Sequence, residues 1–72
     1  MYQVILTGSE KQQNKNYDRL FAKMDDFAFL VNKTSSDNEY KNNDSYVVEF
    51  NTMPQEVQEW VDEQRFMELT LV

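Results

Sequence analysis

The side chains that could do chemistry in this protein are mainly carboxylates, because the 72-residue sequence contains no histidine and no cysteine. This composition removes most nucleophile–base pairs and the imidazole and thiolate ligands of metal sites. The single glycine, Gly8, leaves no glycine-rich loop for phosphate. Pairs such as Asp25 and Asp26 are adjacent in sequence and therefore do not face each other on a helix. The sequence thus predicts a protein that is neither an enzyme nor a cofactor carrier.

An all-oxygen cation site is the one metal-binding option that this composition leaves. Asp37, Glu39 and Asp44 lie within one short polar segment and supply the required carboxylates. A calcium loop also needs a central glycine and an acidic twelfth ligand in register, and this segment has neither. We therefore predict no metal site.

The charge balance is strongly acidic, with thirteen acidic residues against seven basic ones and a net charge of −6. Such a protein is poorly suited to neutralising nucleic-acid phosphates or to binding an anionic membrane. We therefore expect no direct contact with nucleic acid or membrane. The charge suits a partner protein that has a basic surface.

The acids are densest on one expected helix. Its apolar positions recur at helical spacing and form a buried stripe: Met53, Val57, Trp60 and Val61. Thr52 is the expected N-cap, and Gln55 completes a capping box, with Pro54 in the first turn. The outward face is acidic: Glu56, Glu59, Asp62 and Glu63. Arg65 is the only base nearby, so this face lacks basic partners at i, i+4 spacing. Trp60 is expected in the core and not at an interface.

The strand that precedes this helix is the clearest in the sequence. Tyr46, Val48 and Phe50 share one face, whereas Val47 and Glu49 share the other. β-branched and aromatic residues of this kind fit a pleated, half-buried surface. Residues 46–50 therefore predict a strand with one apolar and one mixed face.

The first half of the sequence predicts a strand and a helix. Residues 2–7 form a short β-rich run that ends at Gly8. Residues 10–16 are polar, and they are either a loop or the exposed first turns of a helix, with Ser9 and Gln12 at capping-box spacing. A helical pattern then leads to an expected end near Asp26: Tyr17, Leu20, Phe21, Met24 and Phe27.

Two further strands and a loop complete the predicted order. Residues 27–33 (FAFLVNK) predict a second strand, and residues 66–72 (FMELTLV) predict a fourth. Residues 34–44 (TSSDNEYKNND) are almost wholly polar and predict a long loop. This loop is either a mobile tip or a binding loop in which Tyr40 is the only large apolar group.

The order of strand, helix, strand, strand, helix, strand is that of the ferredoxin-like βαββαβ arrangement. It predicts one α+β domain over residues 1–72, with both helices on one face of a four-stranded antiparallel sheet. The first and third strands would be central. The rival interpretation is a three-stranded sheet whose C-terminal segment joins another chain.

Two helices can cover only one face of such a sheet. The helix-facing layer is predicted to contain Tyr2, Val4, Leu6, Tyr46, Val48, Phe50, Met67, Leu69 and Leu71. The open face would contain Gln3, Ile5, Thr7, Val47, Glu49, Glu68, Thr70 and Val72. This open face is mixed in character, so it is either solvated or a modest interaction surface.

RNA binding is an alternative because this fold class includes the RNA-recognition motif. That family stacks bases on aromatic residues within a motif of the form K/R-G-F/Y-G/A-F-V-x-F/Y. When Phe50 is aligned with the last position, only Val48 and Phe50 match, and the basic residue, the glycine and both stacking aromatics are missing. The fold could be shared, but this function does not carry over.

In size, charge and lack of cysteine and catalytic groups, the sequence resembles small acidic proteins that act as DNA mimics. Many of these are encoded by phages or mobile elements, and they include some anti-CRISPR proteins. The resemblance implies an inhibitor or regulator that docks acidic side chains on a basic, nucleic-acid-binding surface. The candidate partner-binding residues are Glu56, Glu59, Asp62, Glu63, Glu49, Glu68, Asp37, Glu39 and Tyr40. The alternative is a homodimeric structural or regulatory module that assembles through a sheet edge or the open sheet face.

The expected location is the cytoplasm. No apolar run approaches the roughly 20 residues of a transmembrane helix, and no basic region followed by an apolar core marks a signal peptide. We therefore expect a complete, unprocessed intracellular protein, and the absence of cysteine fits that compartment.

Overall fold

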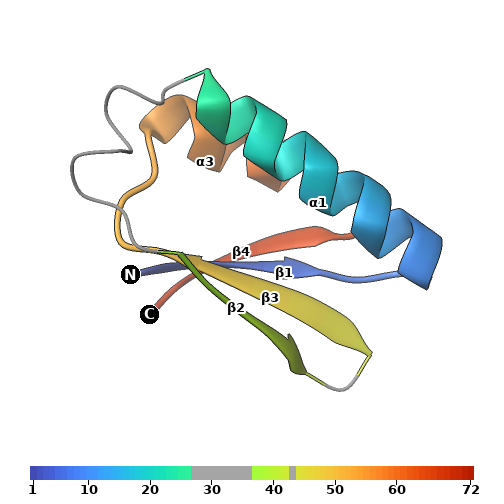
Figure 1. The fold of residues 1–72 in the computed structure, drawn as a ribbon. Coiled ribbons are helices and arrows are strands. Elements are labelled where there is room, and N and C mark those ends of the chain that lie inside the picture. The colour runs from blue at the N-terminus through green and yellow to red at the C-terminus, as the bar shows by residue number, and fades with distance from the viewer. Residues whose placement is uncertain (27–36, 43) are drawn as a thin grey trace.

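The computed structural model describes residues 1–26, 37–42 and 44–72. Its elements are β1 (Tyr2–Leu6), α1 (Glu10–Asp25), β2 (Asp37–Asn42), β3 (Ser45–Phe50), α3 (Gln55–Glu63) and β4 (Met67–Leu71). The strands form one antiparallel sheet in the order β2-β3-β1-β4. Both helices lie on the same face of that sheet (Figure 1). The predicted α+β ferredoxin-like arrangement is therefore confirmed, with β1 and β3 at the centre.

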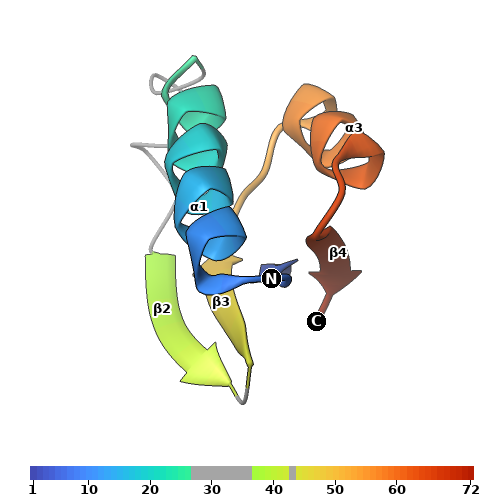
Figure 2. The same cartoon turned by 90° about the vertical axis from the view of Figure 1, so that its right-hand side faces the viewer.

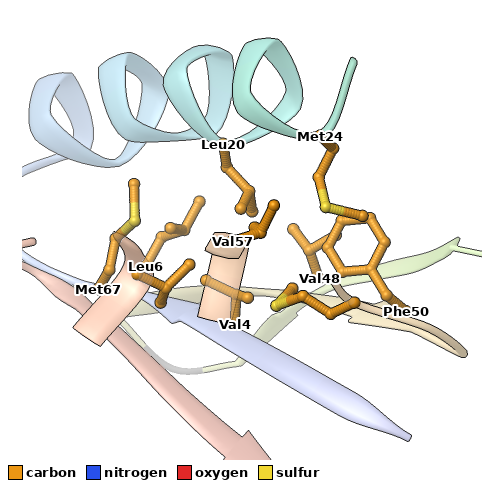
Figure 3. Packing of buried hydrophobic residues seen from close by; sticks show 10 residues of the cluster. Val4, Leu6, Leu20, Met24, Val48, Phe50, Val57 and Met67 are labelled. Carbon is orange, nitrogen blue, oxygen red and sulfur yellow. The ribbon is translucent and has the colours of Figure 1, made fainter. Parts of the chain in front are cut away.

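The core lies between the helices and the central strands. Val4 of β1 pairs with Val48 of β3, and both side chains are fully buried. Leu20 of α1 and Val57 of α3 cover this pair and are also fully buried (Figure 3). Burying an aliphatic side chain of this size stabilises the fold by about 1.5–3 kcal/mol. These contacts hold both helices on one face.

α1 begins at Glu10, seven residues before the first position of its apolar pattern. The Ser9 side chain accepts a hydrogen bond from the Gln12 amide at 3.2 Å, while the Ser9 amide donates to Gln12 Oε1 at 2.9 Å. This reciprocal capping box satisfies two backbone groups of the first turn. Residues 10–16 are thus helix and not loop. The helix ends at Asp25, as the pattern predicted.

The predicted N-cap of the second helix is wrong. The N-cap is Pro54 and not Thr52, and no side chain caps this end. A residue before proline is disfavoured in helical backbone conformation, so Met53 cannot lie in the first turn. Met53 is instead buried in the core, and the carbonyl of Pro54 accepts the first hydrogen bonds, from Val57 and Gln58 at 3.0 Å.

The loop predicted over residues 34–44 is also wrong, because β2 (Asp37–Asn42) occupies most of it. β2 pairs along its whole length with β3. An edge strand forms a hydrogen-bonded ladder on one side only, and this backbone pairing does not require an apolar sequence. The strand predicted over residues 27–33 lies outside the described residues.

The two faces of the sheet largely follow the predicted alternation, with two departures at individual residues. Val47, on the open face opposite Tyr40 and Ile5, is only 2% exposed. Leu71 belongs by register to the helix-facing side but is 73% exposed. It is the last residue of β4, a strand that is buried at Met67 and exposed at its other end. Within the described ranges, neither helix has the length and apolar character that crossing a bilayer requires.

We predict that Gly8→Ala destabilises the protein by about 1–3 kcal/mol. Gly8 has a φ of +89°, which L side chains rarely adopt, and a Cβ there would lie 2.5 Å from Gln12 Oε1 and 3.0 Å from Cδ1 of Phe66. The methyl group would therefore strain the turn and push away the capping glutamine. Urea unfolding followed by Trp60 fluorescence measures the change. Asn14→Ala, at an exposed position of α1, is the control and should leave stability within about 0.5 kcal/mol.

Candidate protein-binding surface

The outward side of α3 carries an acidic face, which we define as Glu56, Glu59, Asp62 and Glu63. All four residues are exposed. In the part of the chain that the structure describes, none of these carboxylates forms an ion pair, and the only recorded contact is a 3.5 Å hydrogen bond from Gln55 to Glu59. Val57 and Val61 on the opposite side are fully buried and fix the orientation of the helix. The acidic face is therefore held in position and is exposed to solvent.

Trp60 borders this face on the side of α1. It is partly buried and packs against the core from the margin, so the expectation of a core position holds only in part. The Arg19 guanidinium lies 5.4 Å and the Lys23 ammonium 5.9 Å from the centre of the indole ring. Arg19 also donates to Gln64 Oε1 at 2.6 Å. These cation–π contacts link α1 to α3 and use two bases without pairing them to the acidic face.

Glu49 and Glu68 do not join the acidic face. Both belong by register to the open face of the sheet, on the side opposite the helices. Gln3 Nε2 donates to Glu49 Oε2 and to the Tyr40 hydroxyl, each at 3.1 Å, and Tyr40 is 42% exposed. This network ties β1 to β2 across β3 and shields Val47. These residues therefore form a second, separate surface.

Glu39 lies between β2 and α1 and is held by two hydroxyl groups. It accepts hydrogen bonds from Tyr17 at 2.5 Å and from Tyr46 at 2.7 Å. The hydrogen bond to Glu39, together with desolvation and the charge of that carboxylate, raises the pKa of Tyr46 above its usual value. Glu39 therefore links β2 to α1 and to β3. The structure does not place it with the acids of α3. Asp37 opens the same strand opposite Phe50.

Two buried side-chain amides have structural roles that the sequence analysis did not predict. Gln13 is 6% exposed and donates to the carbonyls of Gly8 at 3.0 Å and Asp44 at 2.6 Å. Asn16 is 5% exposed and donates to the carbonyl of Arg65 at 3.4 Å. They join α1 to the β2–β3 turn and to the α3–β4 connection. Only their helical spacing from Leu20 marks them in the sequence.

The structure gives no support to the RNA-binding alternative. Val48 and Phe50, the two positions that match the RNA-recognition motif, face the helices and are buried. The open side of the central strands carries Gln3, Ile5, Val47 and Glu49, none of which has a ring for base stacking. Among residues 1–26, 37–42 and 44–72, no three acidic side chains gather closely enough to hold a metal ion.

Comparison with known protein families, with characterised proteins and with solved structures found no match to this protein. A functional assignment must therefore come from the surfaces themselves.

We predict that Glu39→Gln lowers the pKa of Tyr46 towards its usual value of 10.0. A neutral amide removes the negative charge that opposes ionisation of the hydroxyl. Because the pKa is raised in the folded state, the stabilisation is complete below the unfolded-state pKa and is lost as the pH rises through the folded-state pKa. Spectrophotometric titration of the tyrosines, with Tyr46→Phe identifying the transition, measures the shift. Glu49→Gln is the control. It removes a carboxylate from β3, the strand that carries Tyr46, and should leave the pKa of Tyr46 unchanged.

Proposed function

We propose that this protein is a small non-enzymatic regulator that docks the acidic face of α3 on a basic surface of a partner protein. The observation that carries the proposal is the exposure of all four carboxylates without an ion pair in the described part of the chain. A surface that is only solvated gains nothing from this concentration of like charge. A basic partner would supply the opposite charges that the protein itself does not place there.

The spacing of these charges supports a nucleic-acid-binding site as the target. Glu56 and Glu63 are seven residues apart, which corresponds to about 10 Å along a helix axis. Glu59 and Asp62 lie between them, so the successive intervals along that axis are about 4.5, 4.5 and 1.5 Å, with a mean of about 3.5 Å. One strand of duplex DNA carries a charge about every 3.4 Å. On average, the acidic face thus has the linear charge density of one DNA strand over about two turns of the α-helix.

The rigidity of the acidic face favours inhibition of such a site. α3 is anchored through Val57 and Val61, and its flank is fixed by the Arg19 and Lys23 contacts with Trp60. Charged side chains on a fixed backbone bind with a smaller loss of conformational freedom than charges on a flexible tail. Occupation of a basic groove by this face would exclude nucleic acid without any chemical step.

The test is a charge reversal on α3. Glu59→Lys with Glu63→Lys should weaken binding about tenfold or more, because it replaces two attractions with two repulsions at the contact. Wild-type and variant proteins are immobilised and exposed to nuclease-treated lysate of the source organism. Retained proteins are then eluted with short duplex DNA or with rising salt.

The matched control is Asp18→Lys with Asp25→Lys, which makes the same change in net charge at two exposed positions of α1. The proposal predicts a partner that binds wild type and this control, is displaced by DNA and by salt, and is lost from the α3 variant. If both variants lose the partner equally, net charge alone is responsible and the acidic face is not the site. Retention by the α3 variant, or indifference to DNA, contradicts the proposal.

A further inference from the structure

The two edges of the sheet differ in the features that normally prevent strands from pairing with other chains. β2, at one edge, has the polar and charged sequence DNEYKN. β4, at the other edge, has the sequence MELTL, in which Glu68 is the only charge. Natural proteins protect exposed edges with charges, prolines or bulges. β4 has no proline, and its side chains at 67, 69 and 71 are apolar.

The hydrogen bonds at both ends of the β1–β4 pair show which backbone groups of β4 face outwards. Thr7 donates to the carbonyl of Phe66, and Val72 donates to the carbonyl of Met1, each at 2.8 Å. In an antiparallel pair the bonded positions recur at every second residue. Residues 66, 68, 70 and 72 therefore bond to β1. The amide and carbonyl groups of Met67, Leu69 and Leu71 consequently point away from the sheet.

The same end of β4 exposes apolar surface. Leu71 is 73% exposed and Val72 is 67% exposed, and Met1 beside them is 43% exposed. The outward backbone groups and these side chains form one continuous edge. In the described part of the chain no strand pairs with it. An edge with free donors, free acceptors and apolar side chains is suited to the addition of another strand.

We propose that the added strand is β4 of a second copy, paired antiparallel about a twofold axis at Leu69. Leu69 then faces Leu69 of the other copy, and Met67 faces Leu71, so the outward backbone groups of each copy bond to those of the other. Two sheets become one sheet of eight strands. This inference does not depend on the proposed function of the acidic face.

The sequence of β4 is complementary to itself in this register. On the helix side, the exposed Leu71 is covered by Met67 of the other copy. On the open side, Glu68 lies opposite Thr70, so no two like charges meet. Shifting the partner by two residues in one direction would place Glu68 opposite Glu68, which is destabilising. The charge pattern therefore favours a second copy in the register centred at Leu69.

The proposed pairing has a consequence for α3, which contacts β4 and lies above it (Figure 2). A twofold axis perpendicular to the sheet places the α3 helices of both copies on the same face. Their acidic faces repel each other, and salt screens this repulsion. The dimer should therefore hold or strengthen as salt rises, whereas docking of the acidic face on a basic partner should weaken. The two proposals can fail independently.

The first experiment measures the mass of the intact protein by sedimentation equilibrium over a range of concentrations. We expect a concentration-dependent approach to twice the 8.7 kDa chain mass, undiminished at high salt. Leu71→Lys should give a monomer, because it places charge on the pairing edge of both copies. Its exposure means that folding should survive, which circular dichroism checks. Asn42→Lys, which places the same charge at an exposed position of the other edge strand, β2, is the control and should leave the dimer intact.

A second pair of variants tests the register. Thr70→Lys would face Glu68 of the other copy twice in the dimer and should tighten it roughly two- to tenfold, and Thr70→Glu should loosen it by a similar factor. Equal effects of both substitutions would exclude the Leu69-centred register. A wild-type protein that stays monomeric at millimolar concentration, or a Leu71→Lys variant that still dimerises, overturns the proposal.

Discussion

The burial of one face of β1 and β3 under both helices is the interaction on which the rest of the structure depends. Val4 and Val48 meet at the centre of the sheet, and Leu20 and Val57 cover them. A protein of this size buries only about 60% of the surface of its unfolded chain. Its two helices cover one face of the sheet, and no further helix covers the other face in the described part of the chain. The acidic face, the open sheet face and both sheet edges are consequences of this limit, because each lies outside the single core.

The sequence predicted the parts of the fold that the core itself specifies. The apolar alternation through Tyr46, Val48 and Phe50 reflects burial of one face of β3. The helical spacing of Leu20 and Met24 likewise reflects burial of one side of α1. Both patterns therefore predicted correctly that α1 packs on this face of the sheet. The exposure of the α3 acids followed from the same reasoning, because Val57 and Val61 fix which side of the helix faces outwards. Periodicity is informative wherever apolar burial determines the structure.

Elements held by polar contacts were harder to predict. β2 is fastened by Glu39 to two tyrosines and by Lys41 Nζ, which donates to Gln13 Oε1 at 3.0 Å. None of these contacts leaves a hydrophobic pattern, and the same residue types are common in loops. The distribution of the candidate acids was hidden for a related reason. Whether Glu49 and Glu39 lie beside α3 depends on strand register, which only the assembled sheet defines.

The fastening of β2 also determines how the protein opens. Among the described residues, β2 contacts the rest of the molecule through the backbone ladder to β3, a few side-chain hydrogen bonds and the Tyr40 ring. In contrast, β1, β3 and both helices share the core. Regions with little apolar burial separate at a lower free energy than the whole molecule unfolds. Amide hydrogens of β2 should therefore exchange through a local fluctuation, ahead of those in β1. In that opened form β3 becomes an edge strand. The stability of the β2–β3 hairpin therefore governs how often the edge of β3, which β2 normally covers, is exposed to solvent.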